Sequence, residues 1–207
     1  IGSSATGTSR VGREDFDYFV SFDRHIDNSE FLDVVNNIGL NIVTYKEHRK
    51  YGYLRVVGEL KGNEFVLVPI KNPNGKIKTY EQEIYYHPEF IAEHKRKNHS
   101  LNVILAKEFF SQLGVYKEVK GISCEMMMIK FGDFQTMLHQ FAENDGLRVN
   151  LSPHNDVYSD EPLVVDYPVL GRRSFTSHLT RNMYDNIQSL AREVIDDYKK
   201  FRGSQND

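Results

Sequence analysis

The chain has 207 residues, 40% of them hydrophobic and 27% charged, which suits a globular protein of one large domain or two small ones. Its formal net charge of −3 excludes a chain-wide basic footprint, so a polynucleotide would need a local basic patch. The sequence shows no apolar run of membrane-spanning length, no secretory leader and a single cysteine, Cys124, which excludes an internal disulfide. We therefore expect a protein of the cytoplasm or another intracellular compartment, without membrane association.

The first segment combines a turn of small residues with a pair of acids. Residues 2–8 read Gly-Ser-Ser-Ala-Thr-Gly-Thr, and a strand is predicted over 15–22. Strand alternation places Asp15 and Asp17 on one face and apolar residues on the other. Neighbouring carboxylates repel each other unless a cation joins them, and oxygen ligands favour Mg²⁺ or Mn²⁺. The turn offers N–H and hydroxyl groups to a phosphate, so the segment predicts nucleotide chemistry. An exposed strand end with solvated charges is the alternative for the acid pair alone.

Hydrophobic periodicity predicts the elements that follow. A helix capped by Asn28-Ser29-Glu30 precedes three strands, and Pro73-Asn74-Gly75 marks a turn between a domain of residues 1–72 and a helical domain of residues 73–207. The predicted helices and strands cover 28–38, 40–46, 51–60 and 64–70, then helical segments from 101, 124 and 134, short strands over 148–151 and 163–166, and a final helix from Thr180 or Asn182 to 201. Cys124 and the methionines that follow it are expected in the core.

Six segments carry a resemblance to a known family. The pattern Gly-Ser-x-Ala-x-x-Thr followed by Asp-x-Asp resembles the signature of the nucleotidyltransferase superfamily of DNA polymerase β, and within it the archaeal-type (class I) CCA-adding tRNA nucleotidyltransferases. Further segments similar to that family lie, in order, at 62–69, 103–110 with 114–116, 121–125, 131–134, and 165–168 with 172–174. The resemblance implies an α+β fold, a nucleotidyltransferase palm with a mixed or antiparallel sheet followed by a mostly helical second lobe.

The resemblance also implies a nucleotide site in the first domain. Gly2 and Ser3 would hold the triphosphate of an NTP, foremost ATP. Asp15 and Asp17 would be catalytic carboxylates that bind two Mg²⁺ (or Mn²⁺) ions.

The second lobe would contribute Lys107, Tyr116 and Arg173, which the resemblance implies contact the triphosphate or the base. A lysine and an arginine neutralise phosphate oxygens, and a tyrosine can hydrogen-bond a phosphate or pack on a ring. Without the family, a solvated surface charge is the alternative for Lys107 and for Arg173.

The chain departs from the family pattern in three places. The third carboxylate is replaced by Val66, and Glu64, two residues earlier on the same strand face, is the candidate substitute. Thr6 stands where the family has an arginine that clamps the triphosphate. The sequence ends at Asp207, before the domains that measure a tRNA acceptor arm, and begins where the family has a preceding helix and strand, so we expect that it is trimmed at the front.

Two functions from different classes follow. One is an enzyme that transfers a nucleotidyl group to a hydroxyl of an RNA 3′ end, another nucleotide or a protein, with release of pyrophosphate. The other is a catalytically degraded relative that binds nucleotide or RNA, or scaffolds an active protein partner; a structural module without a nucleotide is a third possibility.

The basic segment 94–99 fits either a polynucleotide groove or a solvated helix face, and the eight histidines show no zinc-ligand spacing. The sequence does not indicate the oligomeric state.

Overall fold

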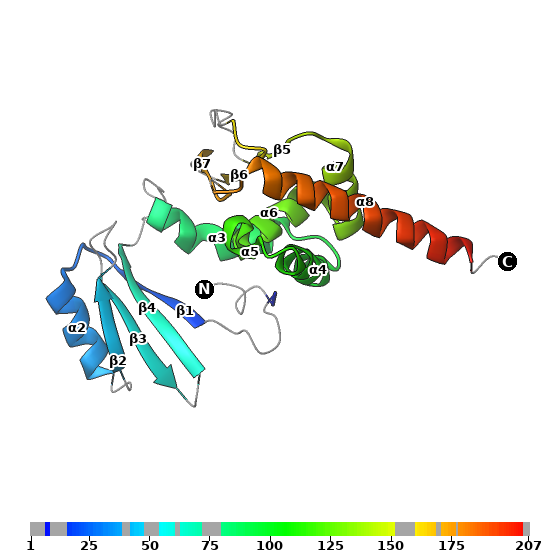
Figure 1. Ribbon diagram of the computed structural model, residues 1–207. Helices are drawn as coiled ribbons and strands as arrows, with labels where there is room; N and C mark the ends of the chain where they lie inside the picture. The colour runs from blue at the N-terminus through cyan, green and yellow to red at the C-terminus, as the bar shows by residue number, and fades with distance from the viewer. Residues whose placement is uncertain are drawn as a thin grey trace. The chain divides into compact units, whose positions relative to one another are not determined.

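The computed structural model describes residues 7–8, 16–38, 42–47, 54–60, 63–71, 80–151, 160–168, 171–176 and 178–204 (Figure 1). The chain forms two compact units, Ile1–Glu89 and Phe90–Asp207. Residues 72–79, which hold the predicted domain boundary, lie outside the described parts of the chain, so that boundary stays a prediction.

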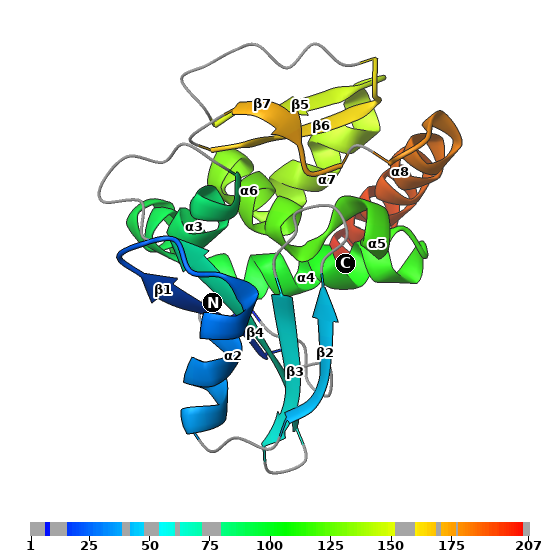
Figure 2. The same ribbon diagram turned by 90° about the vertical axis from the view of Figure 1, so that its left-hand side faces the viewer.

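The first unit is a four-stranded sheet with one helix against it (Figure 2). Its elements are β1 (Phe16–Phe22), α2 (Asn28–Asn37), β2 (Ile42–Glu47), β3 (Leu54–Leu60) and β4 (Asn63–Lys71). The strand order is β1-β4-β3-β2, with β1 parallel to β4 and the other pairs antiparallel. This arrangement confirms the predicted strand, helix and run of three antiparallel strands.

Helix α2 supplies the apolar cover of this sheet. Phe31 and Val35 on its inner face pack with Val56, Phe65 and Leu67 of the central strands, and all five are buried. Burial of each such side chain contributes about 1.5–3 kcal/mol. The helix is therefore held by its apolar stripe rather than by propensity alone.

The start of α2 differs by one residue from the predicted cap. The Asp27 carboxylate accepts a hydrogen bond from the Glu30 backbone N–H at 2.9 Å, and the Glu30 carboxylate accepts one from the Asp27 N–H at 3.1 Å. These reciprocal bonds form a capping box that satisfies two N–H groups at the end of the helix. Asp27 is thus the N-cap, immediately before the predicted Asn28.

The second unit is mainly helical and carries a small three-stranded sheet of order β5-β6-β7. Helix α3 (Tyr80–His94) runs from the first unit into the second along the chain. The other elements are α4 (His99–Gln112), α5 (Tyr116–Val119), α6 (Gly121–Phe131), α7 (Phe134–Glu143), β5 (Leu147–Val149), β6 (Leu163–Tyr167), β7 (Gly171–Ser174) and α8 (Arg181–Gly203). None of the helices in the described parts of the chain is long and apolar enough to cross a membrane.

Aromatic contacts and methionines fill the core of the second unit. The Phe110 and Phe141 rings meet edge to face with centroids 5.8 Å apart, and the Tyr184 ring of α8 lies 5.8 Å from Phe141. The Tyr184 hydroxyl donates to the Asn144 carbonyl at 2.8 Å. Cys124 and the three methionines after it are fully buried, which confirms their predicted place in the core.

A buried polar pair ties α4 to α6. His99 Nε2 lies 2.9 Å from Glu125 Oε2, and both side chains are almost fully buried. Loss of either partner would leave an uncompensated polar group in the core. The pair fixes the beginning of α4 against the middle of α6.

Gly58 of β3 provides a test of the sheet packing. It lies opposite Phe65 in the β3–β4 register, and a Cβ at Gly58 would lie 2.2 Å from Phe65 Cζ. We expect Gly58→Ala to displace the ring and to lower the free energy of unfolding by about 1–3 kcal/mol in urea titrations. Gly146→Ala, whose Cβ would meet its nearest atom at 3.4 Å, is the control. Equal stability of Gly58→Ala and the parent protein would contradict this packing.

Candidate functional site

The parallel pairing of β1 with β4 decides what stands beside Asp17. The Cα partner of Asp17 is Val66, on a neighbouring strand about 4.8 Å away. Val66 is only 9% exposed and apolar. The position where the sequence predicted a missing third carboxylate is therefore adjacent to Asp17 in the sheet, and it holds no acid.

Glu64 occupies the next position on the same face of β4, about 6–7 Å along the strand from Val66. It is exposed, and its Cα partner on β3 is Glu59, another acid. Like charges directly opposite on a sheet repel each other. A cation near this pair would relieve that repulsion.

The remaining predicted groups of the first unit lie outside the described residues. These are Gly2, Ser3, Asp15 and the side chain of Asp17. Among the residues that are described, no three His, Cys, Asp or Glu side chains are grouped to hold a metal. The shared metal site of Asp15, Asp17 and Glu64 therefore stays a prediction.

In the second unit two predicted residues come together at the start of α6. A Cβ placed at Gly121 would lie 2.9 Å from the Tyr116 hydroxyl, 3.3 Å from Lys107 Cε and 3.6 Å from Lys107 Nζ. The lysine amine and the tyrosine hydroxyl therefore meet next to a glycine that opens a helix. We call Lys107, Tyr116 and Gly121 the lysine corner.

Short turns between α4, α5 and α6 form this corner. Helix α4 is followed by its C-cap Leu113 and then by Gly114, whose φ of +69° is a left-handed conformation that glycine adopts at little cost. The Val115 N–H then donates to the Phe110 carbonyl at 3.1 Å, and α5 begins at once with Tyr116. One turn later Lys120, with φ of +66°, redirects the chain into α6. Residues fourteen apart in sequence are thereby brought to one place.

Burial distinguishes Lys107 from a surface lysine. Its side chain is only 3% exposed, which excludes the solvated surface charge that was the alternative. Arg173 lies in β7, but its side chain is outside the described parts of the structure, so its predicted role is not located.

Two residues at the start of α6 received no role from the sequence. Gly121 and Ser123 belong to the segment 121–125 noted above, yet no spacing rule shows that Gly121 faces Lys107. Ser123 is fully buried, and its hydroxyl has no hydrogen-bond partner within the described part of the chain. The proximity arises from the packing of α4 against α6, which the sequence pattern does not reveal.

Asp166 of β6 is a further buried polar residue, and it lies in the segment 165–168 that resembles the family. Its side chain is 4% exposed, and burial raises its pKa to about 6, an effect that the Arg148 charge only partly opposes. One of its carboxylate oxygens, Oδ1, has no hydrogen-bond partner in the described structure. Ionisation of Asp166 at neutral pH therefore costs the fold free energy.

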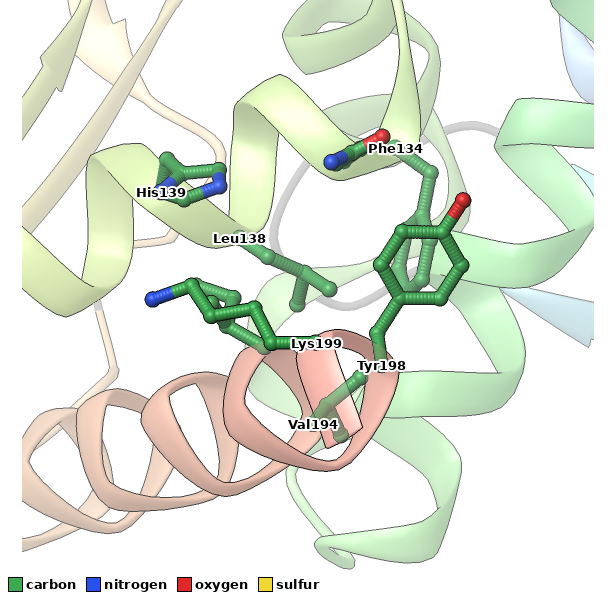
Figure 3. Close-up of a pocket in the computed structure, with 8 residues that line it drawn as sticks. Phe134, Leu138, His139, Val194, Tyr198 and Lys199 are labelled. Carbon is green, nitrogen blue, oxygen red and sulfur yellow. The ribbon is translucent and has the colours of Figure 1, made fainter. Parts of the chain in front are cut away.

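An apolar groove of about 220 Å³ lies between α7 and α8 (Figure 3). Figure 3 shows Phe134 and Tyr198 at one end of the groove and His139 at the other. It is lined by Phe134, Gln135, Leu138, His139, Val194, Ile195, Tyr198 and Lys199. None of these is a predicted site residue, so the groove is separate from the lysine corner.

Comparisons with known proteins confirm the resemblance. Residues 102–201 match the model of the second domain of tRNA nucleotidyltransferase. The chain is 27% identical to a CCA-adding enzyme of Haloarcula marismortui, over 94% of this chain and 44% of the relative. It is 26% identical to one of Methanosarcina barkeri (94% and 45%) and 27% identical to one of Methanocaldococcus jannaschii (94% and 49%). The chain thus spans less than half the length of these relatives.

A solved structure confirms the fold. The polymerase core of TRAMP, an RNA surveillance complex, superposes with a TM-score of 0.59 at 12% identity, over 92% of this chain and 70% of that one. The α+β fold, a nucleotidyltransferase palm followed by a mostly helical lobe, is the one predicted from the sequence.

The pKa of Asp166 gives a test by pH. The pKa of Asp166 is raised from 3.8 to about 6 in the folded protein. The contribution of Asp166 to the free energy of unfolding should therefore be greatest below pH 4 and be lost as the pH rises through 6. In the Asp166→Asn variant this pH dependence should be absent. At pH 7 its free energy of unfolding should be higher than that of the parent protein by on the order of 1 kcal/mol. Urea titrations from pH 4 to 7 measure the effect, with exposed Asp160→Asn as the control. Parallel profiles for Asp166→Asn and the parent would refute it.

Proposed function

We propose that the chain binds a nucleoside triphosphate, foremost ATP, with Mg²⁺ and transfers its nucleotidyl group to a hydroxyl of an RNA. The observation that carries this proposal is the lysine corner. There a buried lysine amine and a tyrosine hydroxyl meet at the first residue of a helix, and the resemblance assigns triphosphate contacts to both.

The electrostatics of the corner favour a phosphate. A phosphate oxygen would form a charge-assisted hydrogen bond with the lysine ammonium, and such bonds are strong in a buried site. The N–H groups in the first turn of α6 add the positive end of a helix dipole. Tyr116 Oη donates a further hydrogen bond. Gly121 leaves the space that a side chain would fill.

The first unit would supply the metal site and the reaction centre. Asp15 and Asp17 are the residues that would hold Mg²⁺, which when bound neutralises charge on the phosphate oxygens. The carboxylate type fits this ion, while Val66 contributes no ligand. The chain's own part in the transfer is to hold the α-phosphorus in line with the acceptor hydroxyl. The hydroxyl oxygen forms the new P–O bond and gives up its proton to solvent, and the bond between the α-phosphorus and pyrophosphate breaks.

RNA as the acceptor is supported by the relatives. The similar enzymes are CCA-adding enzymes, and the structure with the same fold is the core of an RNA surveillance complex.

ATP binding tests the corner directly. Wild-type protein should melt at a higher temperature with 1 mM ATP and Mg²⁺, because a ligand of the folded state stabilises it. Lys107→Met removes a charge-assisted hydrogen bond and should weaken ATP about tenfold or more, as measured by calorimetric titration. Lys199→Met, at an exposed site of α8, should bind like wild type.

The melting temperature of each variant without ATP separates lost binding from lost folding. Tyr116→Phe keeps the ring and removes only the hydroxyl, so it should weaken ATP with little change in that temperature. A wild-type melting temperature that ATP and Mg²⁺ leave unchanged would overturn the proposed function.

A catalytically degraded protein that binds nucleotide without turnover is the second candidate, and Val66 beside Asp17 is the observation that favours it. Val66→Asp would restore an acid next to Asp17 and should raise pyrophosphate release from labelled NTP about tenfold or more if that acid is the only defect. Val66→Asn, similar in shape but uncharged, is the matched control. Turnover by the wild-type protein itself would exclude the degraded interpretation.

A further inference from the structure

We propose that the turn between α3 and α4, with His94, Lys95, Arg96 and Lys97, binds single-stranded RNA through its backbone and one base. The proposal deepens the proposed function, since it rests on RNA being the acceptor and names a surface that would hold it. We call these four residues the basic turn.

Unmatched charge is the first observation. Lys95, Arg96 and Lys97 are consecutive and exposed, and within the described residues none of them forms an ion pair. Three of the five cations of α8 differ, because each forms an ion pair with an acid one turn away on the same helix: Arg181 with Asp185, Lys199 with Asp196, and Lys200 with Asp197. Glu93 is the nearest acid in sequence, and in a chain of net charge −3, three adjacent exposed cations that form no ion pair within the described residues make a local surface for a polyanion.

The turn is held in a defined conformation. The Lys95 N–H donates to the Ile91 carbonyl at 2.8 Å, and the His99 N–H donates to the Arg96 carbonyl at 3.1 Å. Asn98 adopts a left-handed φ of +61° as the N-cap of α4. The turn is therefore prepared before any ligand binds, which lowers the entropic cost of binding.

Arg96 rests on the end of α6. A Cβ at Gly132 would lie 2.7 Å from Arg96 Nη1, so the guanidinium lies against the glycine that ends this helix. The last turn of α6 also carries the exposed Lys130, whose amine donates to the Asn150 carbonyl at 3.3 Å. The nearby acid Asp133 is engaged as the N-cap of α7, where it accepts the Thr136 N–H at 2.7 Å.

An aromatic platform adjoins the cations and favours RNA over an acidic protein surface. The exposed His94 ring stacks on the largely buried Phe90 ring, with centroids 4.2 Å apart and planes 21° apart. His94 Nδ1 lies 2.8 Å from the Phe90 carbonyl, which fixes the ring. Cations beside an exposed, supported ring are the combination with which proteins bind single strands, through phosphates and a stacked base.

The test is fluorescence anisotropy with a labelled, unstructured 12-nucleotide RNA between 50 and 200 mM KCl. Lys95→Gln/Arg96→Gln/Lys97→Gln should weaken binding about tenfold or more at 50 mM and reduce the slope of log K against log salt by about 2, three contacts at roughly 0.7 each. The control Lys199→Gln/Lys200→Gln/Arg202→Gln removes the same charge and should stay within about twofold of wild type.

A second variant separates the stacking contribution from charge. His94→Ala should weaken the RNA about fivefold or more without a change in the salt slope, because it removes a ring and no phosphate contact. Melting temperatures establish that each variant is folded.

Other results would contradict RNA binding by the basic turn. Equal losses in the test and control triples, or no RNA binding by wild-type protein at 50 mM KCl, would overturn the proposal. Competition by poly-glutamate as strong as that by unlabelled RNA would assign the basic turn to an acidic protein instead.

The triple variant should keep the thermal shift by ATP and Mg²⁺. If wild type lacks that shift while the RNA results hold, the proposed function fails and the basic turn stands.

Discussion

The parallel pairing of β1 with β4 is the constraint on which the first unit depends. Its register is set by the core, because Phe65 and Leu67 must face α2. A slip of one residue would turn both of them to the other face, and a slip of two would move Val66 away from Asp17 at the loss of ladder hydrogen bonds. The chain therefore cannot slide Glu64 into the position beside Asp17. The missing acid is a fixed property of the fold.

The lysine corner depends on different contacts. It is built from residues of the second unit, by the turn at Gly114 and the packing of α4 on α6, whereas Val66 belongs to β4 of the first unit. Loss of the acid at Val66 therefore leaves the corner intact. In the proposed function, affinity for a triphosphate and the ability to transfer it would be separable, because they would rest on separate sets of residues.

The sequence predicted the elements with strong periodicity and missed those without it. Helix α2 and the strands of the first sheet were found because their apolar residues recur at one period. Helix α3 was missed because Pro88 interrupts its pattern, and β7 because it reads Gly-Arg-Arg-Ser. The burial of Lys107 could not be predicted from the sequence either, because a lysine in a helix is normally solvated, whereas here it lies close to Gly121 of α6. The family resemblance singled out Lys107, and the tertiary structure shows that its side chain is buried.

Valine at position 66 also has a physical benefit. An acid there would lie next to Asp17 and two residues from Glu64, already paired with Glu59, so it would add repulsion to a strand with its neighbours buried. Without a metal such an acid lowers stability; with one it becomes a ligand. Valine removes the penalty and the possible ligand together. With Val66, β4 carries one acid, Glu64, and no metal is needed to offset a second one.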